Sequence, residues 1–188
     1  MKSFVILYAT REGHTRRIAE YVGDALRKAG HAADVMDVGR PLANLDLARY
    51  SGAVLAASIH IGKHEKSMVD FVKAHRPALE KMPTTFLSVS LSQAGVEDAN
   101  RRPEKKARSA AEVKKTIELF LRRTGWRPTH VHPVAGALLY RQYRPAIRLL
   151  MRIISKMAGG STDTSRDHEY TDWQAVSRFA GEIAAAAA

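Results

Sequence analysis

Short apolar runs alternate along the chain with stretches in which apolar residues recur every three or four positions. The apolar runs occupy residues 4–9, 33–38, 53–58, 85–90 and 131–135. Runs of this length are typical of buried parallel strands, and the three-to-four spacing is typical of one helix face. The helical stretches cover residues 15–29, 66–75, 103–124 and 172–185. This alternation predicts a doubly wound α/β fold with a five-stranded parallel sheet in the order 2-1-3-4-5.

One segment between the fifth strand and the last helix does not fit this alternation. Roughly 35 residues lie there, whereas a connection in an α/β unit usually has about 2–6. Pro145 opens a helical stretch that ends at Gly159-Gly160, the order expected of helix boundaries. Its basic residues step by four, at Arg144, Arg148, Arg152 and Lys156, and its apolar side is formed by Ile147, Leu150, Met151, Ile154 and Met157. We therefore expect one domain over residues 1–188 with an inserted basic amphipathic helix within residues 138–162.

The chain is strongly basic and contains no cysteine. Its formal net charge is +11 at pH 7, and no acidic residue lies between Glu118 and Asp163. Such a basic half indicates an anionic partner, namely lipid headgroups, nucleic acid or a polyanionic substrate, unless it is only a solvated face. The absence of cysteine excludes disulfides and thiolate chemistry. Because no apolar stretch is long enough for a signal peptide or a membrane span, we expect a cytoplasmic protein, soluble or peripheral.

The turn after the first strand reads Thr-Arg-Glu-Gly-His-Thr from Thr10 to Thr15. A strand that runs into a helix N-terminus presents backbone N–H groups and the positive end of the helix dipole to an anion. The turn lacks the glycine spacing of dinucleotide sites and the Gly-Lys pair of a P-loop. Its hydroxyls and single glycine suit one terminal phosphate, with Arg11 and His14 adding positive charge. An ordinary capped turn explains the same residues equally well.

Two further strand ends carry candidate ligand-binding residues. In open α/β sheets, ligands gather at the carboxyl ends of strands where the strand order reverses. After the third strand come Ser58, Ile59, His60, Ile61 and Gly62, and at the fourth come Ser90, Leu91 and Ser92, followed by a polar, basic loop over residues 93–102. These ends suit a flat ring whose phosphate lies in the first turn. Alternatively, these residues belong to ordinary connections that bind no ligand.

The histidines do not form a recognisable metal site. His64-Glu65 begins a zinc-protease pattern, but Met68 stands where the second histidine belongs. His130 and His132 share one strand face without an evident third ligand. No Gly-x-Ser-x-Gly elbow is present either. We therefore expect neither a metal centre nor a serine hydrolase.

Several separated motifs together resemble the menaquinone-dependent protoporphyrinogen IX dehydrogenase family, which has a flavodoxin-like fold and serves bacterial haem synthesis. The motifs are residues 10–15, residues 57–62, residues 134–138 with Tyr140 and Tyr143, residues 159–164 and residues 169–173. The resemblance covers nearly the whole chain. The last two motifs are distinctive, since simple flavodoxins are not expected to carry them.

The resemblance implies a non-covalently bound FMN. Its phosphate would lie in residues 10–15, and its ring between the loops after the third and fourth strands. Residue by residue, the family's cofactor-binding positions fall on Thr10, Arg11, Gly13, His14, Thr15, Ser58, Ile59, His60, Ile61 and Gly62. Ser90, Leu91 and Ser92 occupy the corresponding place on the fourth strand without matching a fixed family pattern.

The activity that the resemblance implies is oxidation of protoporphyrinogen IX to protoporphyrin IX. Six electrons leave in three flavin cycles, and menaquinone or ubiquinone reoxidises the flavin. No residue stands out as a general base. The rival functions are a flavodoxin-type electron carrier, an NAD(P)H-quinone reductase and a nucleic-acid-binding module. Carriers of this fold tend to be acidic, unlike this chain, and few aromatic residues are available for base stacking, so we expect no nucleic-acid partner.

The inserted basic helix then has three interpretations. Arg141, Arg144, Arg148, Arg152 and Lys156 are its candidate contact residues. Their side chains could pair with the substrate's propionates, since guanidinium suits carboxylate. They could instead hold the protein on the cytoplasmic side of the inner membrane, where each basic residue near an anionic surface contributes about 1 kcal/mol. In the third interpretation the helix covers the domain's own core and its arginines are solvated.

Overall fold

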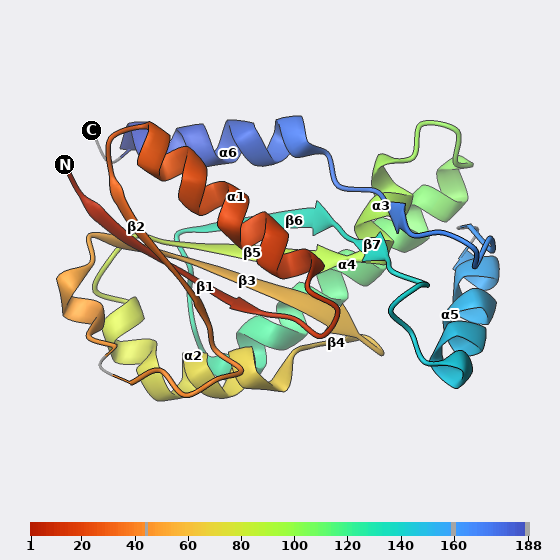
Figure 1. Ribbon diagram of the computed structural model, residues 1–188, viewed down its shortest axis with the longest axis horizontal. Helices are drawn as coiled ribbons and strands as arrows, with labels where there is room; N and C mark the ends of the chain where they lie inside the picture. Colours follow the sequence, from red (N-terminus) through yellow and green to blue (C-terminus); the bar gives the residue numbers. More distant parts are fainter. Residues whose placement is uncertain (44, 159–160, 187–188) are drawn as a thin grey trace.

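A parallel sheet forms the centre of the molecule (Figure 1). The computed structural model describes residues 1–43, 45–158 and 161–186, except for the side chains of residues 150, 154 and 156–158. In spatial order the strands are β2 (Ala32–Asp37), β1 (Ser3–Ala9), β3 (Gly52–His60), β5 (Thr84–Ser90) and β6 (His130–Ala135). The five strands and their predicted order are therefore confirmed. Since all five run parallel, their carboxyl ends lie at one edge.

Helices cover both faces of the sheet (Figure 1). One face carries α1 (His14–Lys28) and α6 (Trp173–Ala186), and the other carries α2 (Lys66–Leu79) and α4 (Pro103–Thr124), with a single 3-10 turn, η1 (Leu47–Arg49), before β3. Because successive strand residues point to opposite faces, the sheet contributes to two apolar clusters. Ile6 and Val54 pack under α1 and α6, whereas Leu7 and Leu55 pack against α2 and α4.

The prediction of a loop over residues 93–102 was wrong in its first half, where the structure has α3 (Leu91–Glu97). Ser90 ends β5 and at the same time caps this helix, because its Oγ accepts a hydrogen bond from the Gln93 N–H at 3.1 Å. A serine before a helix satisfies one of the first unpaired N–H groups. The polar composition of the segment concealed this helix start.

The third strand is longer than the sequence predicted. It continues past Ser58 to His60 and pairs with a short antiparallel strand, β4 (Lys63–His64). The two-residue turn between them, Ile61-Gly62, has φ values of 49° and 70°. Positive φ at both positions is the geometry of tight hairpin turns, and it is uncommon for a β-branched residue such as isoleucine.

The inserted helix predicted between the fifth strand and the last helix is present as α5 (Pro145–Ala158). It is flanked by β7 (Ala137–Leu138) and β8 (His168–Glu169), which pair with each other outside the main sheet. A separate apolar cluster forms here around Leu138, Tyr140 and Tyr143. The insertion therefore folds on its own small core at the end of the molecule where the strands terminate (Figure 1).

Burial of His64 makes the fold sensitive to pH. Its Nε2 lies 2.9 Å from the Ser88 hydroxyl, and its ring packs against Phe86 and Phe120. Burial lowers the pKa of His64 from 6.5 to about 4, so the folded protein keeps this ring neutral where the unfolded chain binds a proton. Unfolding is therefore favoured progressively as the pH falls from 6.5 towards about 4.

We expect His64→Gln to remove this part of the pH dependence, because glutamine keeps a polar group near Ser88 but does not titrate. Urea unfolding across that pH range measures the effect. The free energy of unfolding should fall less steeply in the variant than in the wild type. Parallel curves for the two proteins would contradict the assignment.

Candidate functional site

The turn from β1 into α1 forms an anion-binding geometry. Gly13 precedes α1 with a φ of 86°, and its N–H donates to the Thr10 Oγ1 at 3.1 Å. No side chain caps the helix that begins at His14. The first N–H groups of a helix have no partner within it, and the helix dipole places partial positive charge there. The turn therefore offers backbone donors to an anion.

His14 is held in one tautomer behind this turn. The Thr171 hydroxyl donates its single proton to the Ala135 carbonyl at 2.7 Å, so it must accept the proton of the His14 Nε2–H, 2.7 Å away. Burial lowers the pKa of His14 and favours its neutral ring. The Nδ1 atom is then a bare acceptor, shielded from solvent and without a hydrogen-bond partner among the described residues.

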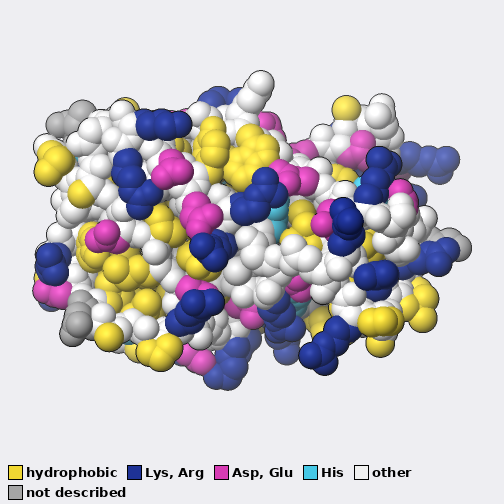
Figure 2. Space-filling view, in the orientation of Figure 1, with side chains coloured by type: hydrophobic (Ala, Val, Ile, Leu, Met, Phe, Trp, Pro, Cys, Tyr) yellow, Lys and Arg dark blue, Asp and Glu magenta, His cyan; other side chains and the backbone are white. Residues whose placement is uncertain are grey.

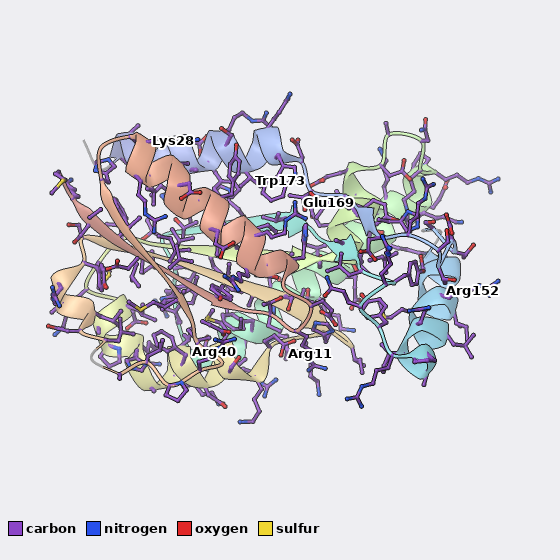
Figure 3. All side chains as sticks on the ribbon, in the orientation of Figure 1. Arg11, Lys28, Arg40, Arg152, Glu169 and Trp173 are labelled. Atoms are coloured by element: carbon purple, nitrogen blue, oxygen red, sulfur yellow. The ribbon has the colours of Figure 1, made fainter. Side chains whose placement is uncertain are left out.

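The positive charge that the sequence analysis attributed to Arg11 and His14 is therefore reduced. Arg11 Nε lies 2.9 Å from Glu65 Oε1, and the arginine side chain is directed towards solvent with 60% of its surface exposed. Figure 3 shows Arg11 at the turn after β1. The electrostatic attraction of this turn for an anion thus comes mainly from the backbone of α1.

A carboxylate–histidine cluster stands beside the turn. His60 Nε2 lies 3.2 Å from Glu12 Oε2 and 3.3 Å from Glu65 Oε1. This cluster was not predicted from the sequence, because 48 positions separate Glu12 from His60 and no spacing within either segment indicates the contact. Only the pairing of β1 with β3 brings the two loops together.

A small cavity lies where β1, β3 and β5 end. Eight residues predicted at these strand ends line it, among them the polar residues Thr10, His14, Thr15, Ser58, His60 and Ser90. Its volume is about 60 Å³, because Leu139, Tyr143 and Met151 of the insertion form its outer wall. Burial raises the pKa of Tyr143 to about 12, so its phenol is neutral.

The other predicted site residues are distributed around this cavity. Ile59 and Leu91 also line it, and Gly13 borders a neighbouring groove with Arg16, Arg17 and Glu169. Ile61 projects away, with 90% of its surface exposed. Ser92 faces a different, larger cavity beside α3. The structure thus brings together most of the predicted residues from three separate loops.

The motif at residues 169–173 contacts α1 through an ion pair and a cation–π interaction with Arg17. Glu169 Oε2 lies 2.7 Å from Arg17 Nη1, and the Trp173 indole donates to the other carboxylate oxygen. The Arg17 guanidinium also lies over the Trp173 ring, 5.6 Å from its centroid. Although burial raises the pKa of Glu169, these hydrogen bonds outweigh it and lower the pKa. Figure 3 shows Glu169 and Trp173 between the N-terminal ends of α1 and α6.

The basic residues of the insertion lie in different environments. Arg141, Arg144 and Arg152 are exposed, and Figure 3 shows Arg152 pointing outwards from α5. Arg148 instead donates from Nε to the Tyr140 carbonyl at 2.9 Å, which makes it part of the insertion's own fold. The side chain of Lys156 lies outside the described residues.

Part of the exposed surface of α5 is apolar. Ile147, Leu149 and Ile153 are exposed by 45%, 58% and 50%, while Met151 packs inwards on the insertion's cluster. Figure 2 shows hydrophobic side chains beside lysine and arginine side chains over this helix. Of the expected apolar side, Met151 is directed inwards and Ile147 is exposed, while the side chains of Leu150, Ile154 and Met157 lie outside the described residues. The exposed Leu149 and Ile153 did not belong to the expected apolar side.

Two kinds of site are not found in the described part of the chain. No helix there is long and apolar enough to cross a membrane. Within the same residues, no group of three or more His, Cys, Asp or Glu side chains could hold a metal ion, and this includes Glu12, His60 and Glu65. The His130 and His132 rings lie 6.4 Å apart between centroids, and His132 stacks on Phe179.

Comparison with known proteins relates this geometry to one family. Residues 5–165 match the family described as flavodoxin domain. The chain is 38% identical over 180 residues to the Escherichia coli (strain K12) protein named protoporphyrinogen IX dehydrogenase (quinone), covering 96% of this chain and 93% of that one. The Leishmania major protein of the same name is 34% identical over 182 residues, covering 96% and 74%. A short-chain flavodoxin associated with a bacterial microcompartment has the same fold, with a TM-score of 0.54 and 15% identity over the full length of both chains.

A flavodoxin domain implies a flavin cofactor. The site suits the terminal phosphate of such a cofactor better than it suits the flat ring. The uncapped N-terminus of α1, the αL glycine and the Thr10 and Thr15 side chains suit a terminal phosphate. The cavity of about 60 Å³ is far smaller than the roughly 300–1,000 Å³ of ligand pockets. This cavity therefore does not enclose a whole flavin ring, and Leu139, Tyr143 and Met151 are the side chains of the insertion that line it.

Proposed function

We propose, on the premise that this chain belongs to the flavodoxin-domain family and to its protoporphyrinogen IX dehydrogenases, that it oxidises protoporphyrinogen IX with bound FMN and passes the electrons to a quinone. The observation that carries the proposal is the extent of the similarity, which spans the insertion as well as the sheet. A bare electron carrier of this fold needs no such insertion. The reaction places the protein in haem synthesis.

FMN is the flavin that best suits the turn after β1. A phosphomonoester matches the backbone donors of α1, while Thr10, Gly13 and Thr15 stand around them. The ends of β3 and β5, at Ser58 and Ser90, would flank the ring. When bound, the flavin accepts two electrons per cycle, so removal of six electrons and six protons takes three cycles. The chain's own part is to bind and orient the reactants and to limit access of water.

Two glycines allow a matched test of phosphate binding. Gly13 and Gly30 both have a φ of 86°, and a Cβ at either position would meet nothing within 4 Å. Alanine at either site should cost about 1–2 kcal/mol through backbone strain alone. Only Gly13→Ala should weaken FMN binding, by about tenfold, because only Gly13 aligns the N–H groups of α1. Quenching of flavin fluorescence measures the affinity, and equal affinities in the two variants would exclude this role of Gly13.

The activity itself is tested by supplying protoporphyrinogen IX under strict exclusion of oxygen to the FMN-loaded protein. We expect porphyrin fluorescence to appear only when a quinone is present, with three quinones reduced per porphyrin formed. Rapid reduction of the flavin by NADH or NADPH, without porphyrinogen oxidation, would instead identify an NAD(P)H-quinone reductase. If protoporphyrinogen IX, NADH and NADPH all failed to reduce the flavin, the remaining function would be that of an electron carrier, and the proposal would be refuted.

We further propose that α5 holds the protein on the cytoplasmic face of the inner membrane, with no nucleic acid among its partners. The exposed Leu149 and Ile153 give the helix an apolar surface, and the exposed Arg144 and Arg152 stand just before and along the same helix. An amphipathic helix of this kind lies in the interface of an anionic bilayer, where its apolar side chains and its charges act together. A membrane location also gives access to a lipid-soluble quinone.

Vesicle sedimentation tests the membrane proposal. We expect binding to vesicles that contain anionic lipid, and little binding to purely zwitterionic ones. Replacing Arg144 and Arg152 with glutamine should weaken binding by about 2 kcal/mol, or roughly 30-fold, since each basic residue contributes about 1 kcal/mol. Leu149→Ser with Ile153→Ser should also weaken it, whereas Ile61→Ser removes an even more exposed apolar residue elsewhere and should not. Equal binding by all variants would contradict the proposal.

A further inference from the structure

A second cavity of about 670 Å³ lies beside the strand-end cavity. Its walls come from α3, the start of α4, β7, the end of α5 and the segment that leads into β8. Leu91 lines both cavities and so forms the partition between them. A molecule in the larger cavity would therefore lie next to a flavin ring at the ends of β3 and β5.

The larger cavity combines apolar walls with two arginines. Leu91, Leu138 and Tyr170 provide apolar surface, and Arg101 and Arg166 come from different segments of the chain. Two acidic residues also line it, but both are engaged locally. Glu97 accepts a hydrogen bond from Gln93 Nε2 at 2.9 Å, and Asp98 accepts one from the Asn100 N–H at 3.0 Å.

The position of Arg101 depends on the absence of a side chain at Gly95. A Cβ at Gly95 would lie 2.6 Å from Arg101 Nη1 and 2.9 Å from its Cζ, and 2.6 Å from the Ser109 hydroxyl. These separations are too short for real contacts, so the guanidinium lies directly against the backbone of α3. Glycine at this position thus makes room for the guanidinium in the wall of the cavity.

The opposite wall is held by a hydrogen-bond network at Ser161. Its carbonyl accepts from the Tyr140 hydroxyl at 2.8 Å and from the Ser155 hydroxyl at 2.6 Å. Arg166 stands in the same segment, and its Nε lies 3.0 Å from Asp163 Oδ2. A guanidinium has five N–H donors, so this contact occupies only a fraction of its capacity.

We propose that this cavity is the binding site for the tetrapyrrole substrate, with Arg101 and Arg166 each binding one of its two propionates. This inference rests on the proposed function. The volume lies within the range of ligand pockets, and the apolar walls suit the pyrrole rings. Guanidinium recognises carboxylate through paired, charge-assisted hydrogen bonds. A quinone offers these arginines only neutral carbonyl acceptors and no carboxylate for a charge-assisted pair, so the two arginines favour the dicarboxylate substrate. Arg144 and Arg152 do not line this cavity and are left for the membrane.

Direct binding tests the site without relying on turnover. The probes are mesoporphyrin IX, a stable porphyrin with two carboxylates, and its dimethyl ester, which has none, both in the same detergent. The FMN-loaded wild type should bind the diacid at least about tenfold more tightly than the ester, because a hydrogen bond to a charged group contributes about 1.5–3 kcal/mol. Equal affinity for the two probes, or no binding of either, would overturn the assignment.

Variants at Gly95 and Arg101 locate the site. Arg101→Ala should weaken diacid binding about tenfold and leave ester binding unchanged. Gly95→Ala should have the same effect while keeping the positive charge, because its methyl group displaces the guanidinium and alanine favours the helix. Arg102→Ala, which removes a neighbouring exposed charge that does not line the cavity, is the matched control. If Arg101→Ala and Arg102→Ala have the same affinity for the diacid, the assignment of this cavity as the binding site is wrong.

Kinetics separate this inference from the proposed function. Arg101→Ala should raise the KM for protoporphyrinogen IX and leave the KM for the quinone unchanged. If Arg101→Ala raised only the KM for the quinone, the cavity would be the quinone-binding site and the inference would be overturned. If the wild type oxidises protoporphyrinogen IX and Arg101→Ala does so with the same KM, the inference fails while the function stands. If the wild type does not oxidise it, the function fails, and the probe measurements still decide whether the cavity binds a dicarboxylate tetrapyrrole.

Discussion

Parallel pairing of β1 with β3, and of β3 with β5, requires that all three strands leave the sheet at the same edge. The register sets Ala9 beside Ala57 and Ser58 beside Val89, so the loops that follow converge. α1 starts within this convergence, without a side-chain cap and after a glycine in the left-handed region. The first N–H groups of α1 have no partner within the helix, and they lie at the mouth of the strand-end cavity, where a ligand can accept from them.

The insertion adds a second small core beside the sheet. It has its own apolar core around Tyr140 and Tyr143, and its inner side chains close the strand-end cavity. Beyond them it encloses the larger cavity together with α3. The segment after the insertion then contacts α1 through Glu169, Thr171 and Trp173, so the position of the insertion is coupled to the helix whose N-terminus lies at the strand-end cavity.

Periodicity predicted the elements that bury regular apolar faces. The five strands, α1, α4 and α5 follow directly from apolar spacing, and the resemblance supplied the family. α3 was missed because its seven residues are mostly polar or small, and its start is set by the Ser90 cap rather than by an apolar face. Helix spacing also grouped Arg148 with its neighbours, although the fold turns it onto the Tyr140 carbonyl.

Contacts between distant segments were beyond the reach of any local pattern. The approach of Glu12 to His60 depends on strand order, and the approach of Ser109 in α4 to Gly95 in α3 depends on how α3 turns back towards α4. The small volume of the strand-end cavity depends on side chains that arrive some 80 residues after the strand ends at His60. Such features arise from tertiary packing, which overrides local propensity.

Calorimetric titration of the cofactor-free protein with FMN and with riboflavin tests the account most directly. The two ligands share the ring and differ only in the phosphate, which is the group that the N-terminus of α1 is expected to bind. We predict one FMN bound per chain and an affinity for riboflavin at least about a hundredfold weaker, because several charge-assisted hydrogen bonds are lost. Equal affinity for both ligands, or no binding of FMN, would contradict the account.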